Sequence, residues 1–335
     1  MKKIIAITLC LMMLASVMTG CATSNTSNGD KLSIVTTIFP EYDWVVQILG
    51  GNAGQADVTM LLDNGVDLHS YQPTADDIIR ISTCDMFIHV GGESDEWVND
   101  VLKEATNKDT VVINLLEALG DDVKEEEVRE GMQEDEHEHG DGHEEEDHGH
   151  EEEEEEAEYD EHVWLSLKNS AKLCGYIAGK LGEIDPDHKD TYTANANAYI
   201  EKLNALDGRY REAVSAGNTK TLLFGDRFPF RYLTDDYGLD YYAAFAGCSS
   251  ESEASFETVM FLANKTDELG LKAIMQIESA NGKIARTIKD TTKNKDQTIL
   301  TLDSMQSTTM KDVKNGVSYL SVMEKNLAVL KDALK

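Results

Sequence analysis

The chain has 335 residues, with 63 acidic and 30 basic side chains and a formal net charge of −33. Such a negative chain is unsuited to bind nucleic acid, whose phosphate backbone would repel it. The charge is uneven, however. Residues 134–161 contain many carboxylates and no Lys or Arg, whereas the rest of the chain is mildly acidic.

The N-terminus predicts an export signal. Two lysines precede an apolar run that is too short to span a membrane as a mature helix. The run ends at MTGC, residues 18–21, which resembles the lipobox where bacterial lipoproteins are cut and acylated. We expect residues 1–20 to be removed and a lipid on Cys21 to anchor an extracytoplasmic protein to the cell membrane. Residues 21–30 then form a flexible tether. The alternative is an ordinary signal peptide with a chance cysteine.

Short β-branched runs alternate with helical patterns from residue 31 onward, which is typical of βαβ units and parallel sheets. The expected strands of the first half are 32–38, 56–62, 86–90 and 111–114. The expected helices are 40–49, 74–81, 95–105 and 168–181. In the second half we expect strands at 221–224, 241–245, 272–277 and 298–302, and helices at 229–237, 253–269, 282–292 and 311–330.

One long helix is expected over residues 186–216, because apolar or small residues recur at alternating steps of four and three. Such a helix braces two lobes or, alternatively, packs on the surface of one domain. The predicted fold is therefore α/β, with two similar lobes that each contain a parallel sheet flanked by helices. The N-terminal lobe spans 31–185, the helix joins it rigidly to the second, and the C-terminal lobe spans 217–335.

Two histidines lie just ahead of predicted helices. His69 lies in DLHSYQPT, residues 67–74, after a strand, where parallel sheets bind ligands. His162 lies in DEHVWLS, residues 160–166. These stretches resemble the zinc and manganese solute-binding proteins of ABC importers, and the likeness runs from about residue 32 to the C-terminus. The resemblance implies a metal site between the lobes, with His69 and His162 as ligands.

The resemblance also implies a carboxylate ligand at Glu278, although an acid at this position could simply stabilise the start of a helix. The family's remaining ligand falls on Arg227, which has no lone pair to donate. Asp226, one residue earlier, would supply the missing oxygen. Alternatively it pairs with Arg227, and water or a mobile histidine completes the coordination shell.

The acidic segment, residues 121–160, is expected to form a disordered loop within the N-terminal lobe, because its composition cannot bury a core. Five histidines interleaved with its carboxylates indicate weak, rapidly exchanging zinc recruitment, and the resembled zinc-binding proteins often carry such an insertion. The alternative is a solvated acidic spacer. The histidines are His137, His139, His143, His148 and His150.

Three cysteines, Cys84, Cys174 and Cys248, remain after export and lipidation, and we expect buried thiols whose redox state the sequence leaves open. The chain lacks the zinc-protease helix motif, the nucleophile-elbow motif and a phosphate-binding glycine loop, which argues against an enzyme.

These features predict a monomer that captures Zn²⁺, with Mn²⁺ as the alternative, and delivers it to the permease of an ABC importer and its ATPase. A freestanding zinc store at the cell surface is the rival function.

Overall fold

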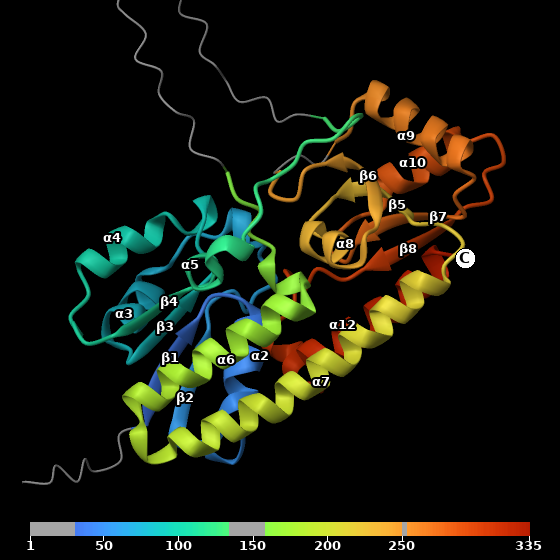
Figure 1. The fold of residues 1–335 in the computed structure, drawn as a ribbon. Coiled ribbons are helices and arrows are strands. Elements are labelled where there is room, and N and C mark those ends of the chain that lie inside the picture. Colours follow the sequence, from blue (N-terminus) through green and yellow to red (C-terminus); the bar gives the residue numbers. More distant parts are fainter. Residues whose placement is uncertain (1–30, 134–157, 250–252) are drawn as a thin grey trace, which may run out of the picture.

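The computed structural model describes residues 31–133, 158–249 and 253–335, which form two lobes joined by a long helix (Figure 1). The N-terminal lobe contains β1 (Leu32–Thr36), α2 (Phe39–Leu49), η2 (Gly50–Gln55), β2 (Ala56–Met60), η3 (Leu68–Ser70), α3 (Ala75–Thr83), β3 (Met86–His89), η4 (Glu93–Asp95), α4 (Trp97–Lys103), β4 (Val111–Asn114), α5 (Leu115–Leu119), η5 (Gly120–Asp122), η6 (Val163–Leu165) and α6 (Leu167–Ile184). The joining segment contains η7 (Pro186–His188) and α7 (Lys189–Ala216). The C-terminal lobe contains β5 (Thr221–Arg227), α8 (Arg231–Tyr237), β6 (Asp240–Phe245), α9 (Phe256–Leu269), β7 (Ala273–Ile277), α10 (Lys283–Thr291), β8 (Thr298–Leu302), α11 (Met310–Lys314) and α12 (Tyr319–Ala333).

Each lobe contains a four-stranded parallel sheet. The strand order is β2-β1-β3-β4 in one sheet and β6-β5-β7-β8 in the other, so the second lobe repeats the connectivity of the first. The prediction of two similar α/β lobes is confirmed. Because all strands of a sheet run the same way, their carboxyl ends share one edge, which is where ligands bind in such folds.

The C-terminal sheet is covered on both faces, which explains why neighbouring residues of its central strand β5 are both apolar and buried. Side chains alternate between the two faces of a strand. In β5, Leu222 and Phe224 join the large core that also contains α12, whereas Leu223 joins a smaller cluster with α9 and α10. This smaller cluster covers the outer face of the lobe.

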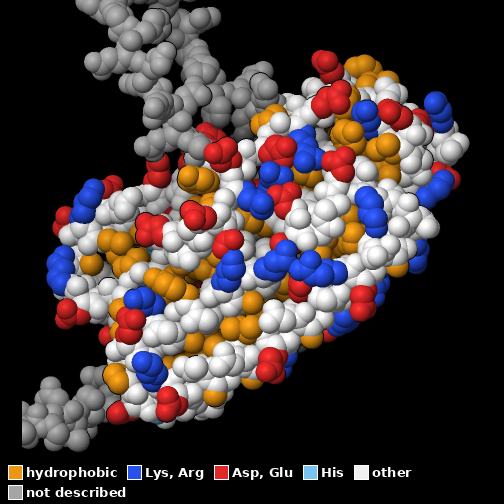
Figure 2. Space-filling view, viewed as in Figure 1, with side chains coloured by type: hydrophobic (Ala, Val, Ile, Leu, Met, Phe, Trp, Pro, Cys, Tyr) orange, Lys and Arg blue, Asp and Glu red, His pale blue; other side chains and the backbone are white. Residues whose placement is uncertain are grey.

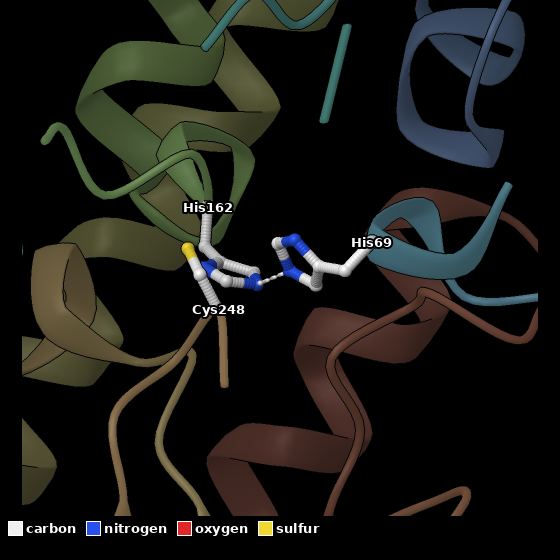
Figure 3. Close-up of side chains that lie close together, drawn as sticks. All are labelled: His69, His162 and Cys248. Atoms are coloured by element: carbon white, nitrogen blue, oxygen red, sulfur yellow. Dashed lines mark hydrogen bonds between the residues drawn. The ribbon is translucent and has the colours of Figure 1, made fainter. Parts of the chain in front are cut away.

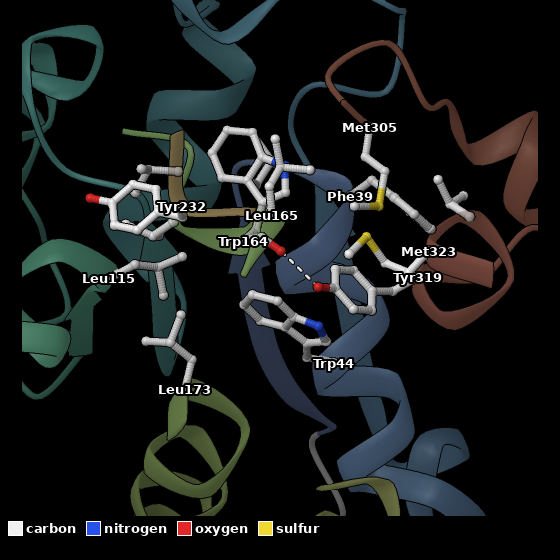
Figure 4. Packing of buried hydrophobic residues seen from close by; sticks show 14 of the residues in the cluster. Phe39, Trp44, Leu115, Trp164, Leu165, Leu173, Tyr232, Met305, Tyr319 and Met323 are labelled. Carbon is white, nitrogen blue, oxygen red and sulfur yellow. Dashed lines mark hydrogen bonds between the residues drawn. The ribbon is translucent and has the colours of Figure 1, made fainter. Parts of the chain in front are cut away.

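Helix α7 braces both lobes. It packs against α2 and α6 of the N-terminal lobe and against α12 of the C-terminal lobe, while α12 itself packs against α2. One apolar core runs through all four helices, and Figure 4 shows part of it, with residues from α2, α6 and α12. Within it, the rings of Trp44 and Tyr319 meet edge to face at 5.5 Å, and the Tyr319 hydroxyl donates to the backbone oxygen of Trp164 at 2.7 Å. The alternative of a surface helix packed on one domain is therefore wrong.

The structure differs from the predicted elements at two places in the C-terminal lobe. The helix expected over residues 311–330 is interrupted, because Gly316 has a φ of 93° and a new helix begins after the cap at Ser318. Strand β5 was expected to end at Phe224 but continues to Arg227. Asp226 is consequently part of a strand and not of the loop after it.

The loop expected over residues 121–160 differs from the structure at both ends. Residues 121–133 and 158–160 are described and contact the C-terminal lobe. The amide of Gln133 donates to the backbone oxygen of Ala244 at 2.9 Å, and Arg129 stacks over the ring of Tyr241 at 3.9 Å. Residues 134–157 lie outside the described part.

The visible surface of both lobes mixes acidic and basic side chains (Figure 2). This matches the mild charge of the sequence outside residues 134–161. Within the described ranges, no helix has the length and apolar character needed to cross a membrane.

We predict that the core beneath α7, to which both lobes contribute residues, is a main source of the stability of the protein. Replacing Tyr319 with alanine removes a fully buried ring and should lower the free energy of unfolding in urea by about 3–5 kcal/mol. Tyr176→Ala is the matched control, because this ring is 43% exposed and its loss should change the stability by no more than about 0.5 kcal/mol. Equal effects of the two substitutions would contradict a shared core.

Candidate metal centre

Two histidines meet at the carboxyl edge of the N-terminal sheet. His69 lies in η3, after β2, and the side chain of Asp67 caps this turn by accepting from the His69 amide at 3.1 Å. His162 directly precedes η6 and is fully buried. The two side chains point toward each other (Figure 3), and their Nε2 atoms lie 3.2 Å apart. The structure thus brings together the two histidines that the sequence singles out.

The separation of the two nitrogens suits a tetrahedral ion. Zinc–nitrogen bonds are about 2.0–2.1 Å long, and a tetrahedral angle between two of them separates the nitrogens by about 3.3 Å. The observed 3.2 Å is close to this value. An ion could therefore bind both imidazoles with little movement of either ring.

Each imidazole is oriented by a partner at its other nitrogen. His69 Nδ1 lies 2.8 Å from Ser94 Oγ and 3.5 Å from Glu161 Oε2. His162 Nδ1 lies 3.0 Å from Asp160 Oδ1. When the partner accepts a hydrogen bond from Nδ1–H, the lone pair of a neutral ring is left on Nε2. Metal-binding histidines commonly have such partners, which fix the tautomer.

The pKa values of the two rings are shifted in opposite directions. Burial, together with the neighbouring His162, lowers the pKa of His69 to about 3, so this ring is neutral. Burial also opposes a charge on His162, but Asp160 outweighs it and raises the pKa of His162 above its ordinary value. His162 can therefore donate from Nε2 to the Nε2 of His69. The proton in this hydrogen bond lies where an ion would bind.

Glu161 lies buried beside the two histidines, and within the described part of the chain only one of its carboxylate oxygens is hydrogen-bonded. Its Oε1 accepts from the amide of Ser94 at 2.9 Å, whereas the buried Oε2 has no hydrogen-bond partner among the described residues. Burial raises the pKa of this carboxyl to about 7. Gly92 allows the close approach, because its φ is 80° and a Cβ there would lie 2.4 Å from Glu161 Oε1.

Arg227 reaches across from the C-terminal lobe. Its guanidinium donates to Asp67 Oδ2 at 2.6 Å and to the backbone oxygen of Ser249 at 3.2 Å. Burial acts to raise the pKa of Asp67, but Arg227 and His69 hold it below its ordinary value. The pair thus links the lobes directly beside His69. The alternative in which Arg227 pairs with Asp226 does not describe this structure, since the side-chain partner is Asp67.

The two carboxylates predicted as further ligands are engaged elsewhere. Asp226 accepts from the amides of Arg227 at 2.9 Å and Ile277 at 3.1 Å, and burial raises its pKa. Glu278 accepts from the amide of Ser304 at 2.7 Å and that of Gln306 at 3.1 Å. Asp226 does line a cavity of about 240 Å³ together with His69 and Arg227. Neither carboxylate joins the tight group of donor atoms around the histidines.

Cys248 joins that group instead. One potential ligand atom from each of His69, His162 and Cys248 lies within 4.8 Å of the other two. Burial beside Asp160 and Glu126 raises the pKa of the thiol well above its ordinary value. The sequence predicts only a buried thiol for this cysteine. Its position three residues after a predicted parallel strand was the feature that could have indicated a ligand.

A second cavity of about 240 Å³ lies next to the histidines on another side. It is bordered by His69, Cys248 and four glutamates, of which Glu126 and Glu158 flank residues 134–157 in the sequence. The five histidines predicted for metal recruitment, and Cys21, lie outside the described residues.

Comparison with known proteins matches residues 34–333 to the family described as "Zinc-uptake complex component A periplasmic". The chain is 33% identical over 333 residues to the zinc-binding lipoprotein AdcA of Streptococcus pneumoniae, covering 99% of this chain and 61% of AdcA. It is 31% identical over 319 residues to the high-affinity zinc uptake system protein ZnuA of Bacillus subtilis, covering 94% of this chain and 92% of ZnuA.

Solved structures agree with these matches. The Zn(II)-bound ZnuA-like domain of S. pneumoniae AdcA has a TM-score of 0.69 at 30% identity and covers 91% of this chain and 99% of that domain. The metal-dependent lipoprotein YcdH of B. subtilis has a TM-score of 0.70 at 27% identity, with the same coverage. The chain thus spans less than two thirds of AdcA but nearly all of its ZnuA-like domain.

The matched family consists of zinc-uptake components and not of enzymes, which agrees with the prediction that this chain is no enzyme. Its description as periplasmic agrees with the predicted export. From residue 34 to residue 333, the chain belongs to the family of periplasmic zinc-uptake components.

Proposed function

We propose that this protein captures one zinc ion between its lobes through His69 and His162, and delivers it to the permease of an ABC importer. The observation that carries the proposal is the pair of Nε2 atoms 3.2 Å apart, each on a ring oriented by a partner at Nδ1. The names of the relatives AdcA and ZnuA point to the same metal. Membership of the zinc-uptake family supports delivery to a permease and its ATPase.

Zinc is favoured over manganese by the donor atoms. Imidazole nitrogens suit zinc, and zinc binds more tightly than manganese at sites of this type. Manganese would be favoured by a site rich in carboxylates, but Asp226 and Glu278 are both occupied by backbone amides.

The five histidines of the acidic segment would concentrate zinc near this site. The described residues that flank the segment support this role, because Glu158 and Tyr159 border the same cavity as His69. Weak sites held close to a tight one raise the local metal concentration.

The proposal predicts one tight zinc equivalent in the chain that begins at residue 22. His69→Ala should weaken this site by more than about 100-fold, because removing a ligand costs more than removing its orienting partner. A deletion of residues 137–150 should keep the tight equivalent. Competitive titration with zinc and manganese measures the affinity and the number of sites in both variants. His188→Ala is the control, since this histidine is hydrogen-bonded to Asp185 away from the site.

The function as an importer component would be contradicted if the deletion removed tight binding while His69→Ala kept it. The protein would then be better described as a zinc store based on the acidic segment.

Zinc affinity should fall with falling pH. The pKa of His162 is raised, so at low pH its Nε2 carries a proton that zinc must displace, whereas His69 stays neutral. Below the pKa of His162, the apparent affinity should drop about tenfold per pH unit for each proton displaced. Zinc titrations at several pH values from about 5 to 8 test this, since that is the histidine range.

The raised pKa of His162 also determines how the stability of the ion-free protein changes with pH. Protonated His162 stabilises the fold below its unfolded pKa, and this stabilisation disappears as the pH rises through the higher folded value. Asp160→Asn removes the carboxylate that raises the pKa of His162. The pH dependence of both zinc affinity and stability should then move to lower pH. An affinity that is constant across the range would contradict proton displacement at this site.

We also propose that Cys21 carries the lipid that keeps the loaded protein beside its permease. Cys21→Ser should release the protein from the membrane fraction into the medium, as detected by immunoblotting. Cells that express this variant should grow more slowly when zinc is limiting, and added zinc should restore growth. If the variant remained in the membrane fraction, the anchor would lie elsewhere in the chain.

A further inference from the structure

Two imidazoles are too few ligands to hold zinc tightly, because protein zinc sites use four protein ligands, or three and a water molecule. Arg227 stands where the resembled proteins have a third ligand, and its guanidinium is bound to Asp67. The oxygens of Asp226 and Glu278 accept hydrogen bonds from backbone amides. In this structure neither carboxylate lies in the group of donor atoms around the histidines, and another residue is closer.

Cys248 offers a sulfur donor beside the histidines. Its loop follows β6 in the C-terminal lobe and packs tightly against His162. A Cβ on Gly247 would lie 3.2 Å from the His162 ring and 2.9 Å from the backbone oxygen of Phe228, so only glycine lets the loop come this close. The amide of Cys248 donates to Glu126 Oε1 at 2.9 Å, which fixes the backbone next to the ring.

We propose that the thiolate of Cys248 is the third protein ligand of the zinc ion, which gives a site of two histidines and one cysteine that spans the lobes. The carrying observation is that donor atoms of these three residues lie within 4.8 Å of one another. The buried Glu161 Oε2, which has no hydrogen-bond partner among the described residues, lies 3.5 Å from His69 Nδ1 and adds negative charge beside this centre. This inference rests on the proposed function, because it adds a residue to the same site.

Ligation requires one rotation of the cysteine side chain. In Figure 3 the sulfur lies beside the His162 ring and not between the two Nε2 atoms. Turning the side chain to another staggered position about its Cα–Cβ bond redirects the sulfur without moving the backbone. On binding, the S–H bond breaks, the proton leaves to solvent and a sulfur electron pair forms the bond to zinc. No atom changes oxidation state.

The other described cysteines cannot take this role. Cys84 and Cys174 are fully buried in the apolar core, and the thiol of Cys84 donates to the backbone oxygen of Ile81 at 3.3 Å. Cys248 is only partly buried and borders a cavity. A thiolate ligand would also sharpen metal choice, because sulfur favours zinc over manganese more strongly than a carboxylate does.

Cobalt substitution tests the ligand directly, because Co²⁺ bound to a thiolate shows a near-ultraviolet sulfur-to-metal band that nitrogen and oxygen ligands do not produce. In the chain that begins at residue 22, the band should saturate at one equivalent of Co²⁺. Cys248→Ser should abolish it while the visible bands of bound cobalt remain, and should weaken zinc binding at least about tenfold. Cys84→Ala is the control and should keep the band.

Alkylation gives a second measurement that needs no variant. Zinc should protect Cys248 from iodoacetamide in the unaltered protein, as read by mass spectrometry of its peptide. Bound cobalt without the sulfur band, together with alkylation that zinc does not slow, would overturn the cysteine ligand and leave the proposed function intact. Failure to bind cobalt or zinc at all would instead overturn the proposed function.

Discussion

The fixed separation of the two lobes is the constraint on which the metal centre depends. It is set by the core shared by α2, α6, α7 and α12, and by polar contacts that cross between the lobes above it. The indole of Trp164 donates to the backbone oxygen of Ser304 at 2.9 Å, and the hydroxyl of Tyr232 donates to that of Asp160 at 2.8 Å. Both contacts lie within two residues of His162 in the sequence. The lobes therefore hold this ring from two sides.

The two braced lobes contribute different residues to the metal centre. The N-terminal lobe contributes both imidazoles together with Ser94 and Asp160, which orient them, whereas the C-terminal lobe contributes Arg227 and Cys248. Arg227 neutralises Asp67 at the edge of the centre, so this carboxylate does not compete for the ion. A thiolate from the same lobe would then supply the negative charge that the guanidinium cannot. An arginine at position 227, where the resembled proteins have a metal ligand, is thus compatible with a metal site.

The alternation of β-branched runs and helical patterns was sufficient to predict the fold, because the central strands are largely buried and their residues are mostly apolar accordingly. The two histidines were predictable because each lies in a short local stretch with a recognisable resemblance. The environment of Glu278 was not predictable, since it depends on the loop at residues 304–306, which is distant in sequence. Cys248 depends on how closely the loop at Gly247 packs against His162, which no local pattern records.

The same proton chemistry explains how a braced protein can exist both with and without its ion. Two buried Nε2 lone pairs that faced each other at 3.2 Å would repel. The raised pKa of His162 and the low pKa of His69 replace this repulsion with a hydrogen bond. In the proposed mechanism, release of zinc would return a proton to the gap between the two rings without a wide separation of the lobes. A small displacement on docking that admits water would be sufficient to start this exchange.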